Sequence, residues 1–360
     1  MAKLKKAKPV AQPTAASTPR QGHYCTHAIE FMLETAHAME TELQIPADLE
    51  HFVAQYLDEA VKFILPDNGQ LLSGQPAYDP RFFDLLKLPY PMCALEFAAD
   101  ETLYNQGSGL AFSARRIALC FDPTQLPTSL LSRLDALMMG RSFLGFLPEH
   151  ALALMAVYEV GGMWACAGGC VVIDLDEGTP HTISKDADGK PILGALAESA
   201  KPYIGMNEKT IPYGLPAQYV LFLQRMLISN LAEEEATRSL YIDTIDEVRV
   251  CYDFLAAINC DNVGTLTVAA PRMLNAKRMK KGKVPFYDYK VLDLAPKAEG
   301  GTGEGAGSHA SPRTHLRRGH VRRLGEKFGN KVLWINATMV NPQRVGEKES
   351  VPVKTYRVRA

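Results

Sequence analysis

Apolar residues recur at every third or fourth position over several long stretches, which is the spacing of helices that bury one face. These stretches are residues 29–43, 49–64, 130–139, 149–160 and 217–235. Pro46 suits the first turn of the second helix. Thr244 with Glu247 fits a capping box, in which each side chain bonds the backbone of the other residue. This pair predicts a further helix that ends near Asn259.

Shorter apolar runs, bounded by Gly, Pro or Asp, predict strands. They lie at residues 92–98, 115–121, 163–175, 266–270, 286–294, 332–335 and 353–359. Gly168 and Gly169 fall inside the third run and predict a turn or a bulge there. Glu96 lies in the middle of the first run, where a carboxylate needs an ion pair, an edge position or a functional role. Among these we favour structural pairing.

The chain falls into parts of different composition. Residues 1–22 have almost no large apolar side chain, and we expect a disordered basic tail there. Residues 23–260 are predicted to form a mostly helical acidic body with some strands. Residues 261–360 are predicted to form a basic β-rich part with a flexible Gly- and Ala-rich loop at 296–311. The fold class that follows is α+β. The sequence leaves open whether the basic part is a separate domain.

The net charge of −1 hides a strong asymmetry. Residues 261–360 carry 20 Lys and Arg against 8 Asp and Glu, a net charge of +12. Residues 23–260 carry 14 Lys and Arg against 32 Asp and Glu, a net charge of −18. Such asymmetry points to a polyanionic partner for the basic part. The alternative is that the acidic and basic parts attract one another within the fold.

Two cationic clusters carry much of this basic charge. The first contains Arg272, Lys277, Arg278, Lys280, Lys281 and Lys283, and the second contains Arg317, Arg318, Arg322 and Arg323. Lysines around a glycine give mobile charges that suit contact with phosphates without reading bases. Aromatic residues on the predicted strands suggest base stacking, although such residues more often belong to a core. They are Tyr287, Tyr289, Trp334 and Tyr356. We therefore predict nucleic acid as the partner and the two clusters as its binding site.

His315 and His320 lie within the second cluster and are flanked by arginines. Two such histidines can perform acid–base chemistry on a phosphodiester while the arginines stabilise the developing charge, so a nuclease-like enzyme is an alternative. Histidines in a basic stretch more often contact a polyanion directly or are ordinary strand residues. A third hypothesis is an inhibitor that binds a host protein through its acidic body, as a nucleic-acid mimic would. The chain contains no nucleotide-binding loop, nucleophile elbow, zincin motif or kinase motif.

The seven cysteines are scattered and odd in number, which is typical of a reducing compartment rather than of a disulfide framework. Cys166 and Cys170 have no second pair at metal-ligand spacing, so we predict buried thiols and no metal site. The sequence identifies no cofactor. The most apolar run, residues 160–173, is too short to span a bilayer, and no apolar segment follows the basic N-terminus as in a secretory signal. We therefore expect a cytoplasmic protein without a membrane partner.

Three blocks together resemble uncharacterised proteins encoded by tailed bacteriophages and prophages. The blocks are Leu88-Pro-Tyr-Pro with Glu96-Phe97, then Asn275-x-Lys-Arg-x-Lys-Lys-Gly-Lys-x-Pro285, then Arg318-Gly-His-x-Arg322 before an aromatic-bearing strand. The resemblance covers about residues 50–360, and that family has no established activity. It implies a setting, the cytoplasm of an infected bacterium, and no chemistry. The leading hypothesis is thus a phage accessory protein that binds nucleic acid.

Overall fold

The computed structural model describes residues 22–69, 71, 85–99, 113–175, 217–222, 230–294, 315–317, 320–335 and 338–340. Its α-helices are α1 (Tyr24–Thr41), α2 (Asp48–Glu59), α3 (Thr128–Leu137), α6 (Glu233–Ile258) and α7 (Arg272–Met279). Short 3-10 turns occur at Asp67–Gly69, Pro123–Gln125, Leu144–Phe146 and Glu326–Phe328. The predicted tail up to residue 21, the predicted loop at 296–311 and the predicted last strand at 353–359 lie outside the described residues.

Most strands belong to one mixed sheet. The strands are β1 (Val61–Ile64), β2 (Met92–Ala98), β3 (Arg115–Phe121), β4 (Ala151–Val160), β5 (Met163–Cys166), β6 (Gly169–Asp174), β7 (Ala217–Leu221), β8 (Val263–Val268), β9 (Tyr289–Leu294), β10 (His315–Arg317), β11 (His320–Arg323), β12 (Val332–Ile335) and β13 (Thr338–Val340). The nine-stranded sheet has the order β7-β6-β4-β3-β2-β1-β9-β8, with β5 also paired to β4. Strand β1 is parallel to both of its neighbours, and the other pairs of this sheet are antiparallel.

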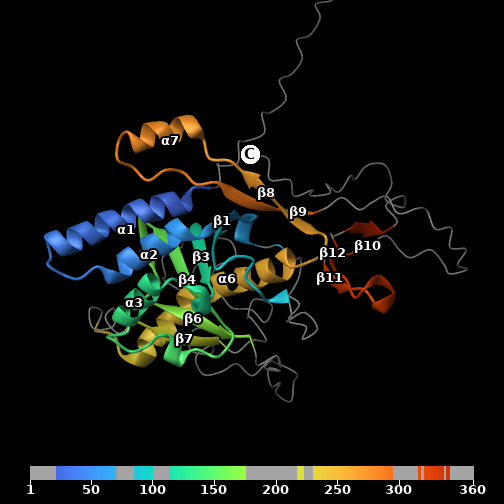
Figure 1. Cartoon of the computed structure of the whole chain (residues 1–360), viewed down its shortest axis with the longest axis horizontal. Coiled ribbons are helices and arrows are strands. Elements are labelled where there is room, and N and C mark those ends of the chain that lie inside the picture. The colour runs from blue at the N-terminus through green and yellow to red at the C-terminus, as the bar shows by residue number, and fades with distance from the viewer. Residues whose placement is uncertain are drawn as a thin grey trace, which may run out of the picture.

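Helices cover both faces of this sheet, and the predicted α+β class is confirmed (Figure 1). Helices α1, α2 and α3 share one buried apolar cluster with Leu119 of β3, whereas α6 shares a second cluster with the adjacent Ala118. Side chains alternate between the faces of a strand, so both faces of β2, β3 and β4 must be apolar. This explains why β2 reads as an unbroken apolar run apart from Glu96.

One predicted helix is a strand in the structure, and another begins as one. The run predicted as a helix at residues 149–160 is β4, a central strand whose first seven residues are buried. A continuous Ala-, Leu- and Met-rich run has no period of two, so its pattern favours a helix. Only the strands paired to both edges of β4 show that it is a central strand. The run predicted at 217–235 begins with β7 and ends in α6, which starts at Glu233, and its residues 223–229 lie outside the described residues. Thr244 consequently lies inside α6, where its hydroxyl donates to the Leu240 carbonyl at 2.7 Å instead of capping a helix.

The second predicted helix also ends earlier than expected. Helix α2 stops at Glu59, and Val61–Ile64 forms β1, the strand that joins the two halves of the sheet. The helical spacing of Ala60, Val61 and Ile64 was therefore misleading, because burial on a central strand selects the same residue types. The break predicted near Gly168 and Gly169 is present, since it separates β5 from β6 along β4. A Cβ atom on Gly169 would lie 2.1 Å from the Val220 carbonyl oxygen, so only glycine fits there.

The basic C-terminal part enters the sheet of the body. Strand β9 pairs in parallel with β1 through Phe63 and Lys290, and β8 pairs with β9 to form the edge. The boundary at residue 260 is therefore not a boundary between sheets. The β11–β12 hairpin is a separate two-stranded sheet that joins the start of β8 through Asp261 and Asn262. Asn262 bonds both the N–H and the carbonyl of Trp334, at 2.7 and 2.9 Å.

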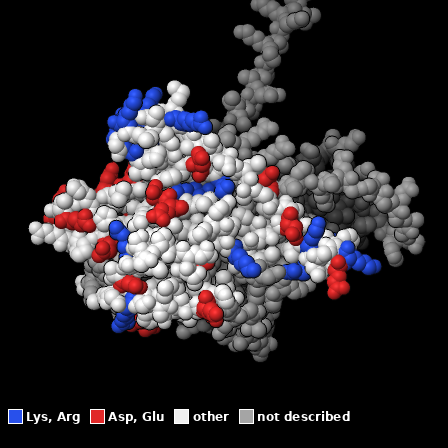
Figure 2. All heavy atoms as spheres, in the orientation of Figure 1, with Lys and Arg blue, Asp and Glu red and all other residues white. Residues whose placement is uncertain are grey.

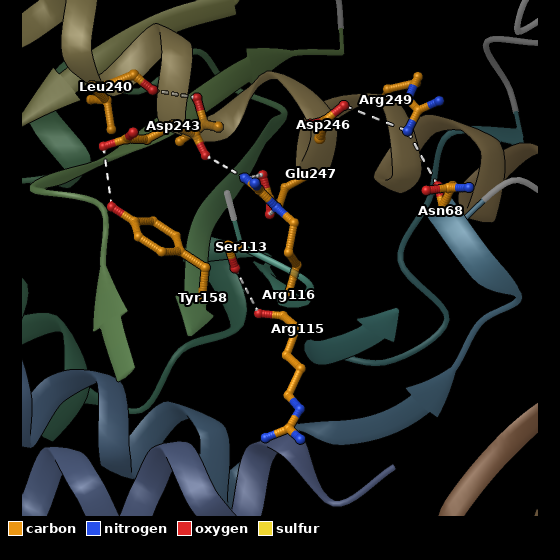
Figure 3. Close-up of polar contacts among 11 residues, drawn as sticks. Asn68, Ser113, Arg115, Arg116, Tyr158, Leu240, Asp243, Asp246, Glu247 and Arg249 are labelled. Atoms are coloured by element: carbon orange, nitrogen blue, oxygen red, sulfur yellow. Dashed lines mark hydrogen bonds and ion pairs between the residues drawn. The ribbon is translucent and has the colours of Figure 1, made fainter. Parts of the chain in front are cut away.

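A buried ion pair joins α6 to the sheet (Figure 3). The Arg116 guanidinium donates to both oxygens of Glu247, at 2.5 and 2.9 Å, and to the Asp243 carbonyl at 2.9 Å. The Glu247 side chain is fully buried and that of Arg116 is 9% exposed. Burial raises the pKa of Glu247, and the charge of Arg116 offsets part of that effect. The neighbouring Arg115 points to the opposite face, where it pairs with Glu159 at 3.1 Å.

Replacing Arg116 alone with methionine is expected to reduce the free energy of unfolding by about 3–5 kcal/mol, because Glu247 would remain as an unpaired buried charge. Urea titration of the purified protein measures the loss. The double variant Arg116→Met with Glu247→Leu removes both charges and is expected to recover a large part of it. A double variant as unstable as the sum of both single variants would contradict this account of the pair.

Candidate functional site

The first cationic cluster lies on an excursion between β8 and β9, which we name the α7 arm (residues 269–288). In Figure 1 the arm stands above α1, at the end of the β8–β9 hairpin. The arm closes at its base, where the backbone N–H of Ala270 donates to the Asp288 carboxylate at 2.7 Å. Asn275 bonds both the N–H and the carbonyl of Phe286, at 2.7 and 2.8 Å. These bonds connect the helix of the arm to its returning segment.

Arg278 fastens the arm to α1. Its guanidinium donates to Glu30 at 2.7 Å and to the Val284 carbonyl at 2.7 Å, and it lies 4.4 Å from the centre of the Phe286 ring. The Arg278 and Glu30 side chains are only 16% and 18% exposed, so this is a largely desolvated, charge-assisted contact. The structure therefore places Arg278 in an anchoring position. Its predicted contact with nucleic acid stays a prediction.

The other cations of the first cluster face solvent. We name them the arm cations: Arg272, Lys277, Lys280, Lys281 and Lys283 are all exposed. None of them forms an ion pair with another residue of the described ranges. Gly282 has a φ of +66°, so the turn between the last lysines uses a conformation that favours glycine. Figure 2 shows lysine and arginine side chains gathered over α7, with acidic side chains scattered below.

The second cluster is placed on the small sheets. Arg322 and Arg323 are exposed on β11, and Arg317 is the last residue of β10. Arg318 lies outside the described residues. The α7 arm leaves the Val268 end of β8, while the β11–β12 hairpin joins its Val263 end. With about 3.3 Å per strand residue, these attachment points lie roughly 17 Å apart. The first cluster and the two β11 arginines of the second cluster are thus carried at opposite ends of one strand.

The histidines proposed for catalysis lie in different strand pairs. His315 is in β10 and pairs with Val340 of β13, whereas His320 is in β11 and pairs with Ile335 of β12. The orientation of their side chains lies outside the described part of the chain. Their catalytic role stays a prediction. In the described ranges, no group of three His, Cys, Asp or Glu side chains is placed to hold a metal ion.

Three aromatic residues predicted to stack on bases make contacts within the fold. Tyr289 is buried, with 2% of its surface exposed, so it is not available to stack on a base. Tyr287 donates its hydroxyl to Asp58, and its ring carries the Lys62 ammonium at 3.8 Å from the ring centre. Trp334 packs against the small apolar cluster under the β11–β12 hairpin. Stacking on a base is therefore excluded for Tyr289, while Tyr287 and Trp334 are half-buried and Tyr356 lies outside the described residues.

Glu96, the acid that the sequence marked as unusual, is 1% exposed and lies where α1, β2 and β9 meet. One oxygen, Oε1, accepts the Cys25 backbone N–H at 2.7 Å and the Tyr289 hydroxyl at 2.5 Å. The carboxyl thus satisfies the first turn of α1, which has no side-chain cap of its own. The predicted structural pairing is present, although its partners are a helix terminus and a tyrosine rather than a cation. Sequence spacing contained no indication of either partner.

Burial raises the pKa of Glu96, and the hydrogen bonds from Cys25 and Tyr289 act in the opposite direction. Its second oxygen, Oε2, has no hydrogen-bond partner among the described residues. Lys62, on the neighbouring β1, is also buried, and burial lowers the pKa of its ammonium. His23 precedes α1, and its ring lies 4.1 Å from the Phe286 ring, between centroids. The start of α1, the first residue of β9 and strand β2 therefore meet at the buried Glu96 carboxyl.

Comparisons with protein-family models, with curated proteins and with solved structures found no match. The resemblance to phage proteins stays a prediction. No helix in the described ranges is long and apolar enough to cross a membrane. The partner of the protein must therefore be inferred from the chemistry of its own surface.

Arg278→Ala is expected to release the α7 arm from α1 while the sheet stays folded. The variant loses the hydrogen bonds to the Val284 carbonyl and to Glu30, which leaves that carboxylate without its arginine partner. Hydrogen–deuterium exchange of residues 269–288 should become faster, and the midpoint of thermal unfolding should change little. The matched control is Lys277→Ala, an exposed neighbour whose loss should leave exchange unaltered. Equal exchange in both variants would rule out the anchoring role.

Glu96→Gln and Glu96→Ala separate charge from hydrogen bonding at the Glu96 contact. Glutamine retains an acceptor for Cys25 and Tyr289, whereas alanine leaves two buried donors unpaired, at about 1–3 kcal/mol for each. Because the folded-state pKa of Glu96 is raised, its contribution to stability is present below the ordinary value of 4.5 and is lost as pH rises. The stability of Glu96→Gln relative to the natural protein should therefore increase with pH. Chemical denaturation from acidic to neutral pH measures this difference, and a constant difference would contradict the assignment.

Proposed function

We propose that the protein binds nucleic acid through the arm cations of the α7 arm. The observation that carries the proposal is the separation of roles within one cluster: Arg278 fixes the arm to α1, and its five cationic neighbours remain exposed and unpaired among the described residues. A fixed scaffold with mobile lysine ends suits phosphates, because a lysine ammonium acts as a point charge without directional readout. Binding of this kind is weakly selective for sequence.

The charge of the rest of the chain supports contact at the arm. Residues 23–260 carry a net charge of −18, so this part of the protein repels a polyanion. A nucleic acid is therefore expected to approach from the side of the arm. Arg322 and Arg323, at the other end of β8, provide a second contact for a longer strand. The proposed setting, the cytoplasm of a phage-infected bacterium, rests on the resemblance of the three sequence blocks alone.

Binding of labelled single- and double-stranded DNA and RNA should weaken steeply with salt, because each phosphate contact releases counterions. The variant Lys280→Ala, Lys281→Ala, Lys283→Ala removes three of the arm cations. It should bind more weakly, and the slope of log K against log salt should become shallower by about 2 to 3. Fluorescence anisotropy over a range of salt concentrations provides both values.

The matched control removes two exposed cations away from the arm, Lys87→Ala with Arg141→Ala. This control should retain the affinity and the slope of the natural protein. Absence of binding at low salt for every nucleic acid would reject the proposal. An affinity that the triple variant leaves unchanged would place the contact somewhere other than on the arm.

A further inference from the structure

Two cysteine side chains meet between α6 and the main sheet. The Sγ atoms of Cys120, on β3, and Cys251, on α6, lie 3.5 Å apart, and both side chains are fully buried. The S–S bond of a disulfide is about 2.0 Å long, so the two sulfurs would have to approach by roughly 1.5 Å. A cysteine sulfur moves with a single side-chain torsion, so small rotations of the two side chains bring the sulfurs closer.

A third thiol, that of Cys93, lies beside this pair. Cys93 is opposite Cys120 in the pairing of β2 with β3, and it is also fully buried. Residues directly opposite on antiparallel strands have Cβ atoms about 4.5–5.5 Å apart, whereas a disulfide usually needs about 3.8 Å. The Cys93 thiol is directed to the Tyr90 carbonyl, at 3.9 Å. Cys251 is therefore the better partner for Cys120.

The thiol pair repeats the connection that the ion pair of Arg116 with Glu247 makes. Cys120 follows Arg116 by four residues on β3, and Cys251 follows Glu247 by four residues on α6. Residues four apart lie on one face of a strand and on one side of a helix. Two side-chain pairs, each between residues 131 apart, therefore hold the same stretch of α6 against β3.

We propose that Cys120 and Cys251 are a redox-modification site and form a reversible disulfide when the protein meets a hydroperoxide. One thiol attacks the peroxide, the O–O bond breaks, and the sulfur takes up one oxygen as a sulfenic acid. The second thiol attacks that sulfur, the S–S bond forms, and the oxygen leaves as water. The two thiols lose two electrons and two protons, and hydrogen peroxide becomes two molecules of water. A dithiol reverses the reaction by exchange.

Access to the sulfurs depends on a movement of α6. Burial raises the pKa of the Cys120 thiol, and a buried thiol that keeps its proton reacts slowly. The reaction therefore requires a transient separation of α6 from β3, and the buried ion pair opposes this separation. Once formed, the disulfide keeps α6 on β3 even when the ion pair opens. The modification goes beyond the proposed function, because neither cysteine belongs to the α7 arm.

The test treats the reduced full chain with hydrogen peroxide, at a concentration that fully oxidises the same chain unfolded in urea. Remaining thiols are alkylated, and linked peptides are identified by mass spectrometry. A link between Cys120 and Cys251 should appear, should be removed by dithiothreitol, and should raise the midpoint of thermal unfolding. Cys251→Ala should abolish the link. The matched control Cys93→Ala removes an equally buried thiol opposite Cys120 and should retain it.

Arg116→Met weakens the attachment of α6 and should accelerate formation of the link by about tenfold or more, while Arg116→Met with Glu247→Leu should restore a slower rate. Equal rates in these variants and the natural protein would refute the role of α6 opening. The peptides of the natural protein decide the main point without any variant. The proposal is overturned if all seven thiols persist, if Cys120 becomes a sulfinic acid, or if Cys120 is linked to Cys93.

Discussion

A single buried carboxyl group holds together three parts of the chain that are far apart in sequence. Glu96 lies 71 residues from Cys25 and 193 residues from Tyr289, and one of its oxygens accepts a hydrogen bond from each. The first donor begins α1, and the second belongs to the strand that brings the C-terminal part into the sheet. Burial strengthens these hydrogen bonds, and it also makes a negative charge on Glu96 unfavourable. The stability of the contact therefore depends on whether Glu96 is protonated. The α7 arm depends on it, because Tyr289 begins the strand to which the arm returns.

The sequence predicted those elements whose patterns are local. Strands β2, β3 and β12 lie where the apolar runs predicted them, since short runs bounded by turn residues have few alternatives. Strands β1 and β4 were predicted as helix, because a strand buried on both faces loses its period of two. Glu247 was taken as part of a helix cap, whereas it pairs with Arg116 of β3. Partners 131 residues apart leave no trace in spacing, and only tertiary packing brings them together.

The sequence identified the first cationic cluster, and the structure shows that its residues do not all have the same surroundings. The exposure of the arm cations agrees with a cluster that favours solvent, but Arg278 is paired with Glu30, and Tyr289, one of the four aromatic residues expected to stack, is in the core. One cluster in the sequence therefore contains residues with two roles, which charge density alone does not distinguish. The difference depends on α1, which presents Glu30 to the arm from a region 248 residues away. The acidic body thus contributes to the basic surface by fixing it in place.

The position of the α7 arm within a hairpin has a consequence for how this protein can change. Val268 and Tyr289 pair with each other at the end of β8 and the start of β9, so the pairing of the two strands is finished where the arm begins. A tight turn would close the same hairpin, and the residues between these positions form a replaceable module. Insertions, deletions and exchanges in this module would change the exposed charge of the arm and leave the pairing of β8 with β9 intact. Homologous proteins with the same sheet are therefore expected to differ most in this module, and a designed loop grafted at the same two positions would inherit a stable scaffold.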